Sequence, residues 1–118
     1  MQASVEITKQ AIQARRNGQT KEMLENHIPS VASRLPWAAQ LMQSIVDEVY
    51  STQETLDPEI HAAYRMEVCF ILNQHPDAEN SLSYAQAYPL LRTCVSDDMG
   101  LQTRCSMSVA HKVSGIAE

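Results

Sequence analysis

The chain has little glycine, few aromatic residues and no long apolar run. Its 118 residues include three glycines, and aromatic side chains make up 5% of the chain. A phosphate-binding loop or a dinucleotide fingerprint needs several closely spaced glycines, so both are excluded, as is the G-x-S-x-G elbow of acyl-transfer enzymes. No apolar run approaches the roughly 18 residues of a membrane-spanning helix. The first ten residues lack the apolar stretch of a signal peptide, which favours a cytoplasmic location.

Cysteine and histidine are also sparse, and their spacing follows no metal-binding pattern. The three cysteines, Cys69, Cys94 and Cys105, form no C-x-x-C pair, and the four histidines form no H-x-x-x-H pair. Metal sites in proteins usually show one of these spacings, so we expect neither a metal nor another cofactor. An odd number of widely separated cysteines predicts free thiols in a reducing compartment.

The charge is acidic and unevenly distributed. The formal net charge is −5; residues 1–36 carry five basic against three acidic side chains, residues 37–80 carry one against eight, and residues 81–118 carry three of each. Clustered cations are needed to neutralise nucleic-acid phosphates, so broad nucleic-acid binding is disfavoured. The apolar share of 44% is ordinary for a globular protein and argues against disorder. We therefore expect one domain that covers residues 1–118.

Apolar residues recur at helical intervals, which predicts an all-α fold. The clearest helix begins at Pro36 and extends to Ser51, with a wide apolar stripe and a polar opposite side. A second begins at Pro58, is capped by Asp57 and extends to Asn73. It contains the five consecutive apolar residues 68–72, and its length favours a helix with neighbours on several sides over a strand. We expect this antiparallel pair, residues 36–51 and 58–73, at the centre of a compact bundle of five or six helices.

The remaining helices have weaker signals. Residues 3–17 read as a first helix that ends at Gly18, and Thr20 can cap the next helix. That next helix should break near residues 26–28, with Pro29 in the first turn of its continuation. We also expect short helices over 80–88 and about 90–97, separated at Pro89, and a last helix over 101–114 that follows Gly100.

Wide apolar stripes and missing catalytic motifs favour a binding protein over an enzyme. The stripes of residues 36–51 and 58–73 are broader than a small bundle can easily cover, which predicts a homodimer. The leading hypothesis is a small non-catalytic regulatory or adaptor protein that docks apolar helix faces on another protein, inhibiting or sequestering it. Tryptophan and tyrosine are enriched at binding hot spots, and methionine adapts to varied surfaces. The expected contact residues are Trp37, Leu41, Met42, Ile45 and Tyr50.

Two other function classes remain open. The only basic cluster could serve a helix-turn-helix DNA-binding regulator, with Arg15, Arg16 and Lys21 on phosphates. The same cations are also typical of a solvated helix end. The third class is a helical enzyme with an acid–base site between helices around Glu67 and His61, although side chains of this kind more often lie at a helix surface.

Overall fold

Seven α-helices and one short 3-10 helix make up the chain in a computed structural model that describes residues 2–80 and 82–118. None of these residues forms a strand, so the predicted all-α bundle is confirmed. The α-helices are α1 Gln2–Arg16, α2 Lys21–Glu25, α3 Ile28–Ala32, α4 Pro36–Val49, α5 Pro58–Gln74, α6 Tyr84–Arg92 and α7 Met99–Ser114, and the 3-10 helix is η1 Pro76–Asn80. If α2 and α3 are counted as one interrupted segment, there are six α-helices, in line with the five or six expected.

Capping residues fix most helix ends where the sequence predicts them. Thr20 accepts a hydrogen bond from the backbone of Met23 at the start of α2, and Asp57 accepts one from Glu59 at the start of α5. The break before Pro29 is also confirmed, because α2 ends at Glu25 and α3 starts at Ile28. Local hydrogen bonds of this kind satisfy backbone groups that the helix itself leaves unpaired.

Two local predictions are wrong. Pro89 lies inside α6 instead of separating two helices; α6 starts after Ser83, which caps it, so the missing proline donor costs this nine-residue helix only one bond. Gly100 was expected to precede the last helix, but it lies in the first turn of α7, which Asp98 caps. Gly115 does end α7, with a φ of 76° in the left-handed region that favours glycine.

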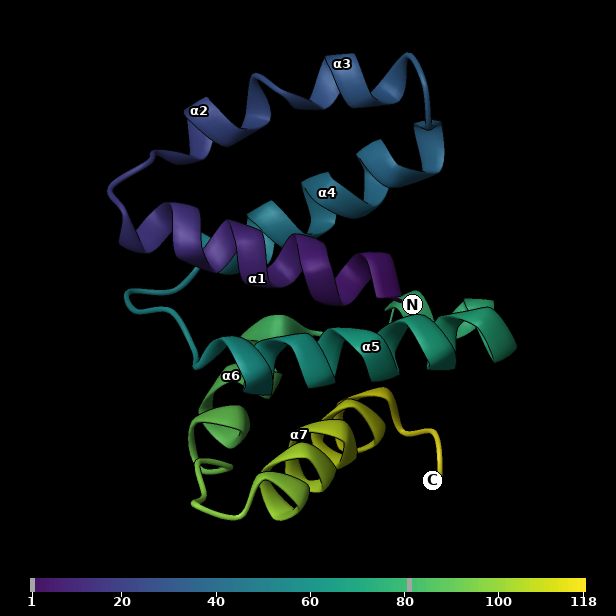
Figure 1. The fold of residues 1–118 in the computed structure, drawn as a ribbon. Coiled ribbons are helices and arrows are strands. Elements are labelled where there is room, and N and C mark those ends of the chain that lie inside the picture. Colours follow the sequence, from purple (N-terminus) through teal and green to yellow (C-terminus); the bar gives the residue numbers. More distant parts are fainter. Residues whose placement is uncertain (1, 81) are drawn as a thin grey trace.

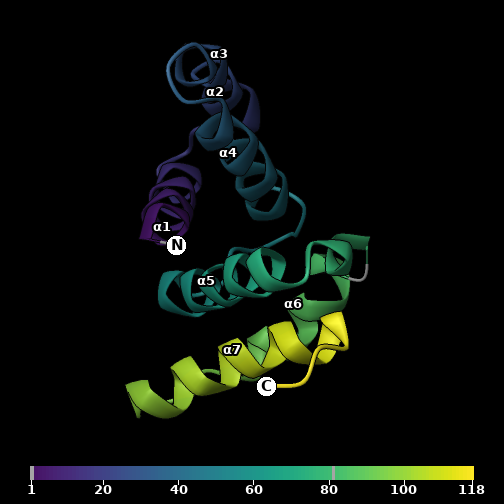
Figure 2. The ribbon, with the colours of Figure 1, turned by 90° about the vertical axis from the view of Figure 1, so that its right-hand side faces the viewer.

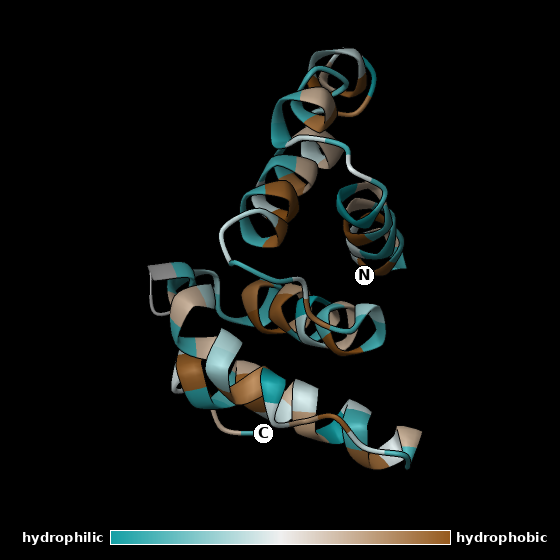
Figure 3. Ribbon diagram, turned by 90° about the vertical axis from the view of Figure 1, so that its left-hand side faces the viewer, coloured by the Kyte–Doolittle hydropathy of each residue, from teal (hydrophilic) through white to brown (hydrophobic). Residues whose placement is uncertain are grey.

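The helices are stacked in tiers with α5 near the middle (Figures 1 and 2). The short helices α2 and α3 form one end, α1 and α4 lie side by side below them, and α6 and α7 lie on the other side of α5. Apolar residues occur along every tier, interleaved with polar ones as in amphipathic helices (Figure 3). The tiers enclose two apolar clusters, one between α1 and α4 and one among α5, η1, α6 and α7.

The central position of α5 is confirmed, but its neighbours differ from the expected pair. The helix packs chiefly on α1 and α7, whereas α4 packs on α1 and α3. Small side chains explain this difference, since α1 buries Ser4 and Thr8 and α5 buries Ala62 and Ala63. Such residues let two helix backbones approach closely. The face of α5 therefore packs on α1, although α4 has the wider apolar stripe.

A disulfide joins Cys94 to Cys105, which corrects the expectation that every thiol is free. The two residues are 11 apart in sequence, and the turn between α6 and α7 brings their Cα atoms to 5.5 Å. Cys69 is a free cysteine. Tertiary packing forms this pair, so no short cysteine motif marks it in the sequence.

Removing this disulfide is expected to lower the free energy of unfolding by about 3 kcal/mol, because a cross-link of this loop length restricts the unfolded chain. Urea unfolding of the Cys94→Ala, Cys105→Ala double variant measures the loss. Cys69→Ala is the matched control, since it removes a thiol outside the bond. Alkylation of three thiols in the unfolded, unreduced protein would contradict the pairing.

Candidate functional site

The five residues expected to bind a partner lie in different environments. Ile45 is fully buried in the α1–α4 cluster, whereas Trp37 is 57% exposed in the first turn of α4. Leu41 is half-buried and packs on the same cluster as Ile45. Ile45 is therefore a core residue of this fold, and Trp37 is accessible. Their common role in binding stays a prediction.

Tyr50 is held by contacts within the chain. Its hydroxyl donates a hydrogen bond of 2.7 Å to the carbonyl of Gln19, and the guanidinium of Arg15 lies 5.5 Å from the centre of its ring. Burial raises the pKa of the Tyr50 phenol, and the nearby Arg15 opposes this only in part. Tyr50 thus ties the end of α4 to the loop between α1 and α2.

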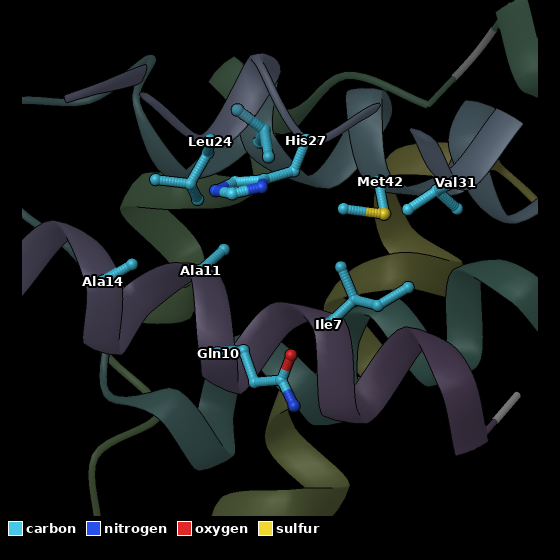
Figure 4. A pocket seen from close by; sticks show the side chains of 9 residues that line it. Ile7, Gln10, Ala11, Ala14, Leu24, His27, Val31 and Met42 are labelled. Carbon is cyan, nitrogen blue, oxygen red and sulfur yellow. The ribbon is translucent and has the colours of Figure 1, made fainter. Parts of the chain in front are cut away.

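Met42 lines an apolar pocket that the sequence analysis did not anticipate. The pocket lies between α1, the α2–α3 segment and α4, and its volume is about 420 Å³. Leu24, His27, Val31 and Met42 face Ile7, Ala11 and Ala14 across it (Figure 4). Its size and apolar lining are those of ligand-binding pockets in proteins, which are concave, mostly apolar and lined by a few polar groups. We call this pocket the α1–α4 groove; Gln10 and Val46 complete its lining.

Two glutamates near the groove, Glu6 and Glu25, make no ion pair with the described residues, although each has a lysine within electrostatic range, Lys9 for Glu6 and Lys21 for Glu25. Lys21 is paired with Asp47 at 3.0 Å. Glu25 accepts a hydrogen bond from the neutral side chain of Gln43, next to the lining residue Met42. Glu6 precedes the lining residue Gln10 by one helical turn and makes no ion pair with the described residues. The groove therefore combines an apolar interior with two nearby carboxylates whose charge is only partly offset.

The three cations of the DNA-binding alternative are committed to contacts within the chain. Arg15 donates hydrogen bonds to the carbonyls of Val49 and Gln53, at 2.5 and 2.9 Å. Arg16 donates to the Thr55 hydroxyl at 3.0 Å and to the Leu56 carbonyl at 3.1 Å. Since Lys21 is paired with Asp47, none of the three belongs to a free cationic surface. These arginines instead fasten the connection between α4 and α5.

His61 and Glu67 do not form a common site. The His61 ring is 1% exposed; its Nε2 lies 3.0 Å from a Glu48 oxygen, and the ring stacks on Tyr84. Glu67 instead faces His111, whose Nε2 is 3.1 Å away. The expectation that these side chains lie at a helix surface is wrong for His61, which is buried, whereas Glu67 is half-buried in a separate contact with His111. Nothing places them together around a substrate.

His111 is held between two acceptors. Its Nδ1 lies 2.9 Å from the Ile116 carbonyl, and its Nε2 faces the Glu67 carboxylate. A neutral imidazole has only one N–H, so the charged form alone donates to both partners. Burial disfavours that form, but the carbonyl and the carboxylate outweigh it and raise the pKa of His111 above its usual value. This cluster secures the end of α7 to α5.

Glu48 was not among the predicted site residues, because it belongs to the polar side of the helix that begins at Pro36. The side chain of Glu48 is only 15% exposed and accepts from both His61 and Arg65, each at 3.0 Å. One signal pointed to it: Arg65 is the only basic residue in the acidic segment 37–80. A lone cation in such a segment needs a carboxylate partner if it is buried.

Among the described residues, no group of three or more histidine, cysteine, aspartate or glutamate side chains could hold a metal ion. No helix in the same part of the chain is both long and apolar enough to cross a bilayer. Neither a protein-family description nor a curated protein nor a solved structure matches this sequence. The geometry of the α1–α4 groove is therefore the main guide to function.

Proposed function

We propose that the chain is a non-catalytic regulatory or adaptor protein that binds a partner protein in the α1–α4 groove, inhibiting or sequestering that partner. The observation that carries this proposal is the groove itself, an apolar pocket of about 420 Å³ between α1 and the α2–α3 segment. A groove of this kind accepts apolar side chains from one face of an amphipathic helix. The expected residue Met42 belongs to it.

One wall of the groove is attached less firmly than the other. The helices α2 and α3 are five residues each and contain no buried residue. They pack on α4, whereas α1 is held by both α4 and α5. Segments with few buried apolar contacts open at low cost in free energy. The α2–α3 wall can therefore adjust to the side chains of a partner without loss of the core.

The two carboxylates near the groove favour a basic partner segment. Glu6 and Glu25 make no ion pair with the described residues, so they attract lysine or arginine residues that lie beside the apolar face of the partner helix. The proposed occupant is an amphipathic helix with two or three large apolar side chains and basic flanks. Its charge also suits the acidic chain as a whole.

A pair of synthetic peptides tests this function. The basic peptide is an amphipathic helix of leucine and lysine, and its counterpart has glutamate in place of lysine. We expect saturable binding of the basic peptide, measured by isothermal titration calorimetry at physiological ionic strength, and at least tenfold weaker binding of the acidic one. Equal binding of both peptides, or binding of neither, would contradict the proposal.

A groove-filling variant locates the binding. Ala14→Phe places a large side chain into the groove lining and should weaken peptide binding at least tenfold. Ala85→Phe is the matched control, because Ala85 is exposed on α6, away from the groove. An unchanged affinity for Ala14→Phe would show that the peptide binds elsewhere.

The homodimer and the cellular compartment also stay predictions. On α4 and α5, Trp37 and Phe70 are the large apolar residues still exposed, at 57% and 42%, and they would supply a dimer contact. Size-exclusion chromatography with light scattering checks the mass, and a monomer at micromolar concentration would count against the dimer. The cytoplasmic location is weakened by the Cys94–Cys105 disulfide, because such bonds are rare in cytosolic proteins.

A further inference from the structure

A second, more polar cavity lies on the other side of α4, next to α5. Its volume is about 280 Å³. Ser44 and Glu48 line it from α4, Arg65 and Val68 from α5, and Glu79 and Tyr84 from the segment that follows. Two apolar residues, Leu72 and Leu82, also contact it. The cavity shares no lining residue with the α1–α4 groove, so its role is independent of the function proposed above.

Arg65 is the unusual member of this lining. The residue is 6% exposed, and both of its side-chain hydrogen bonds use Nη1, one to Glu48 at 3.0 Å and one to Ser44 at 3.4 Å. Its Nε is buried and has no hydrogen-bond partner among residues 2–80 and 82–118. A buried donor without a partner is rare and costly in folded proteins. The guanidinium is therefore incompletely satisfied at the wall of a cavity.

Neither acidic side chain that lines the cavity is a hydrogen-bond partner for the Nε of Arg65. The two oxygens of Glu48 are divided between His61 and Arg65. Glu79 is an exposed residue of η1 and makes no ion pair with Arg65. Burial, with the charge of Glu48, raises the pKa of the Tyr64 and Tyr84 phenols, so both stay protonated and available as donors. The cavity wall thus presents the Arg65 guanidinium and two phenols as donors, beside the carboxylates of Glu48 and Glu79.

We propose that this cavity binds a small carboxylate through Arg65. A guanidinium presents Nε and Nη2 along one edge, and this edge matches the two oxygens of a carboxylate. Nε is covered by protein atoms, so the guanidinium turns toward the cavity as the ligand enters. That turn moves Nη1 relative to both of its partners, Ser44 and Glu48, and the bond to Ser44 is the longer of the two. The ligand is a free carboxylic acid or the terminal carboxylate of a peptide.

Sodium benzoate is the probe for a free carboxylic acid as the ligand. Its ring suits the apolar side of the cavity formed by Val68, Leu72 and Leu82. Titration is followed through the arginine Nε–Hε resonances in a ¹H–¹⁵N spectrum at constant ionic strength, with sodium chloride as the reference salt. We expect a saturable shift of the Arg65 signal with benzoate and none with chloride. An unmoved Arg65 signal, or the same shift with both salts, overturns the proposal for benzoate.

Arg65→Lys separates binding from folding, because lysine keeps a cation for Glu48 but lacks the two-donor edge. Benzoate affinity, followed by backbone amide shifts, should fall at least tenfold in this variant, while Arg104→Gln, at an exposed arginine of α7, should retain it. If Arg65→Lys fails to fold, Leu82→Phe reduces the cavity without altering a charge and should give the same loss. Affinity retained in the folded variant refutes the role of Arg65.

A short acetylated peptide with a free C-terminal carboxylate tests whether the ligand is a peptide terminus. The same peptide with a C-terminal amide is the control. Binding of the acid peptide alone identifies a peptide terminus as the ligand, and binding of benzoate alone identifies a small acid. Either result supports carboxylate recognition. Binding of neither probe, or equal binding of the acid and the amide, overturns it.

Discussion

Replacing Glu48 with alanine is expected to lower the free energy of unfolding by about 3–5 kcal/mol, because it leaves the buried side chains of His61 and Arg65 without their shared carboxylate. Alanine is the better helix former, and Glu48 lies near the negative end of α4, so local effects oppose this loss. The measured change therefore reports the tertiary contact. Urea unfolding followed by circular dichroism measures it.

Asp47→Ala is the matched control for that experiment. Asp47 is the preceding residue of the same helix, and its ion pair with Lys21 is exposed. Exposed pairs contribute about 1 kcal/mol or less, so this variant should remain close to the native stability. Similar losses for the two variants would show that the Glu48 cluster does not stabilise the fold.

Replacing Ile45 with alanine is expected to cost about 2–5 kcal/mol, because it removes a fully buried side chain and leaves a cavity in the α1–α4 cluster. Trp37→Ala, on the same helix, should cost about 1 kcal/mol or less, since more than half of that side chain already faces solvent. Thermal and urea unfolding of the two variants give the comparison.

The same pair of variants separates core from binding residues. If Trp37 binds a partner or a second copy, Trp37→Ala weakens that association while the fold stays intact. Ile45→Ala acts on association only through the stability of the fold. A large loss of stability for Trp37→Ala with none for Ile45→Ala would contradict the exposure of Trp37 and the burial of Ile45.

The sequence predicted the helices better than their contacts. Pro36 and Pro58 mark the starts of α4 and α5, and Thr20 and Asp57 cap helices as expected. These features depend on residues within one turn of each other, so a linear sequence contains all the information they need. Pro89 and Gly100 were the exceptions: the helix that contains Pro89 begins later than its apolar pattern indicated, and α7 begins before Gly100.

The candidate sites were predicted only in part. Met42 does line a groove, but its opposite wall comes from Ile7, Ala11 and Ala14 of α1, a helix that the sequence indicated only weakly. Hydrophobic periodicity indicates which face of a helix is buried, but it does not indicate which other helix packs against that face. For the same reason the periodicity of α4 could not separate buried Ile45 from exposed Trp37.

The sequence by itself determined an all-α chain with defined helix ends, since these follow from local hydrogen bonding and residue spacing. Tertiary structure alone decided that α1 packs on α5, that Cys94 meets Cys105, and that Glu48 joins His61 and Arg65. Each of these contacts joins residues from different helices or turns. Their partners are chosen by the shape and charge of whole packed faces, which no short stretch of sequence contains.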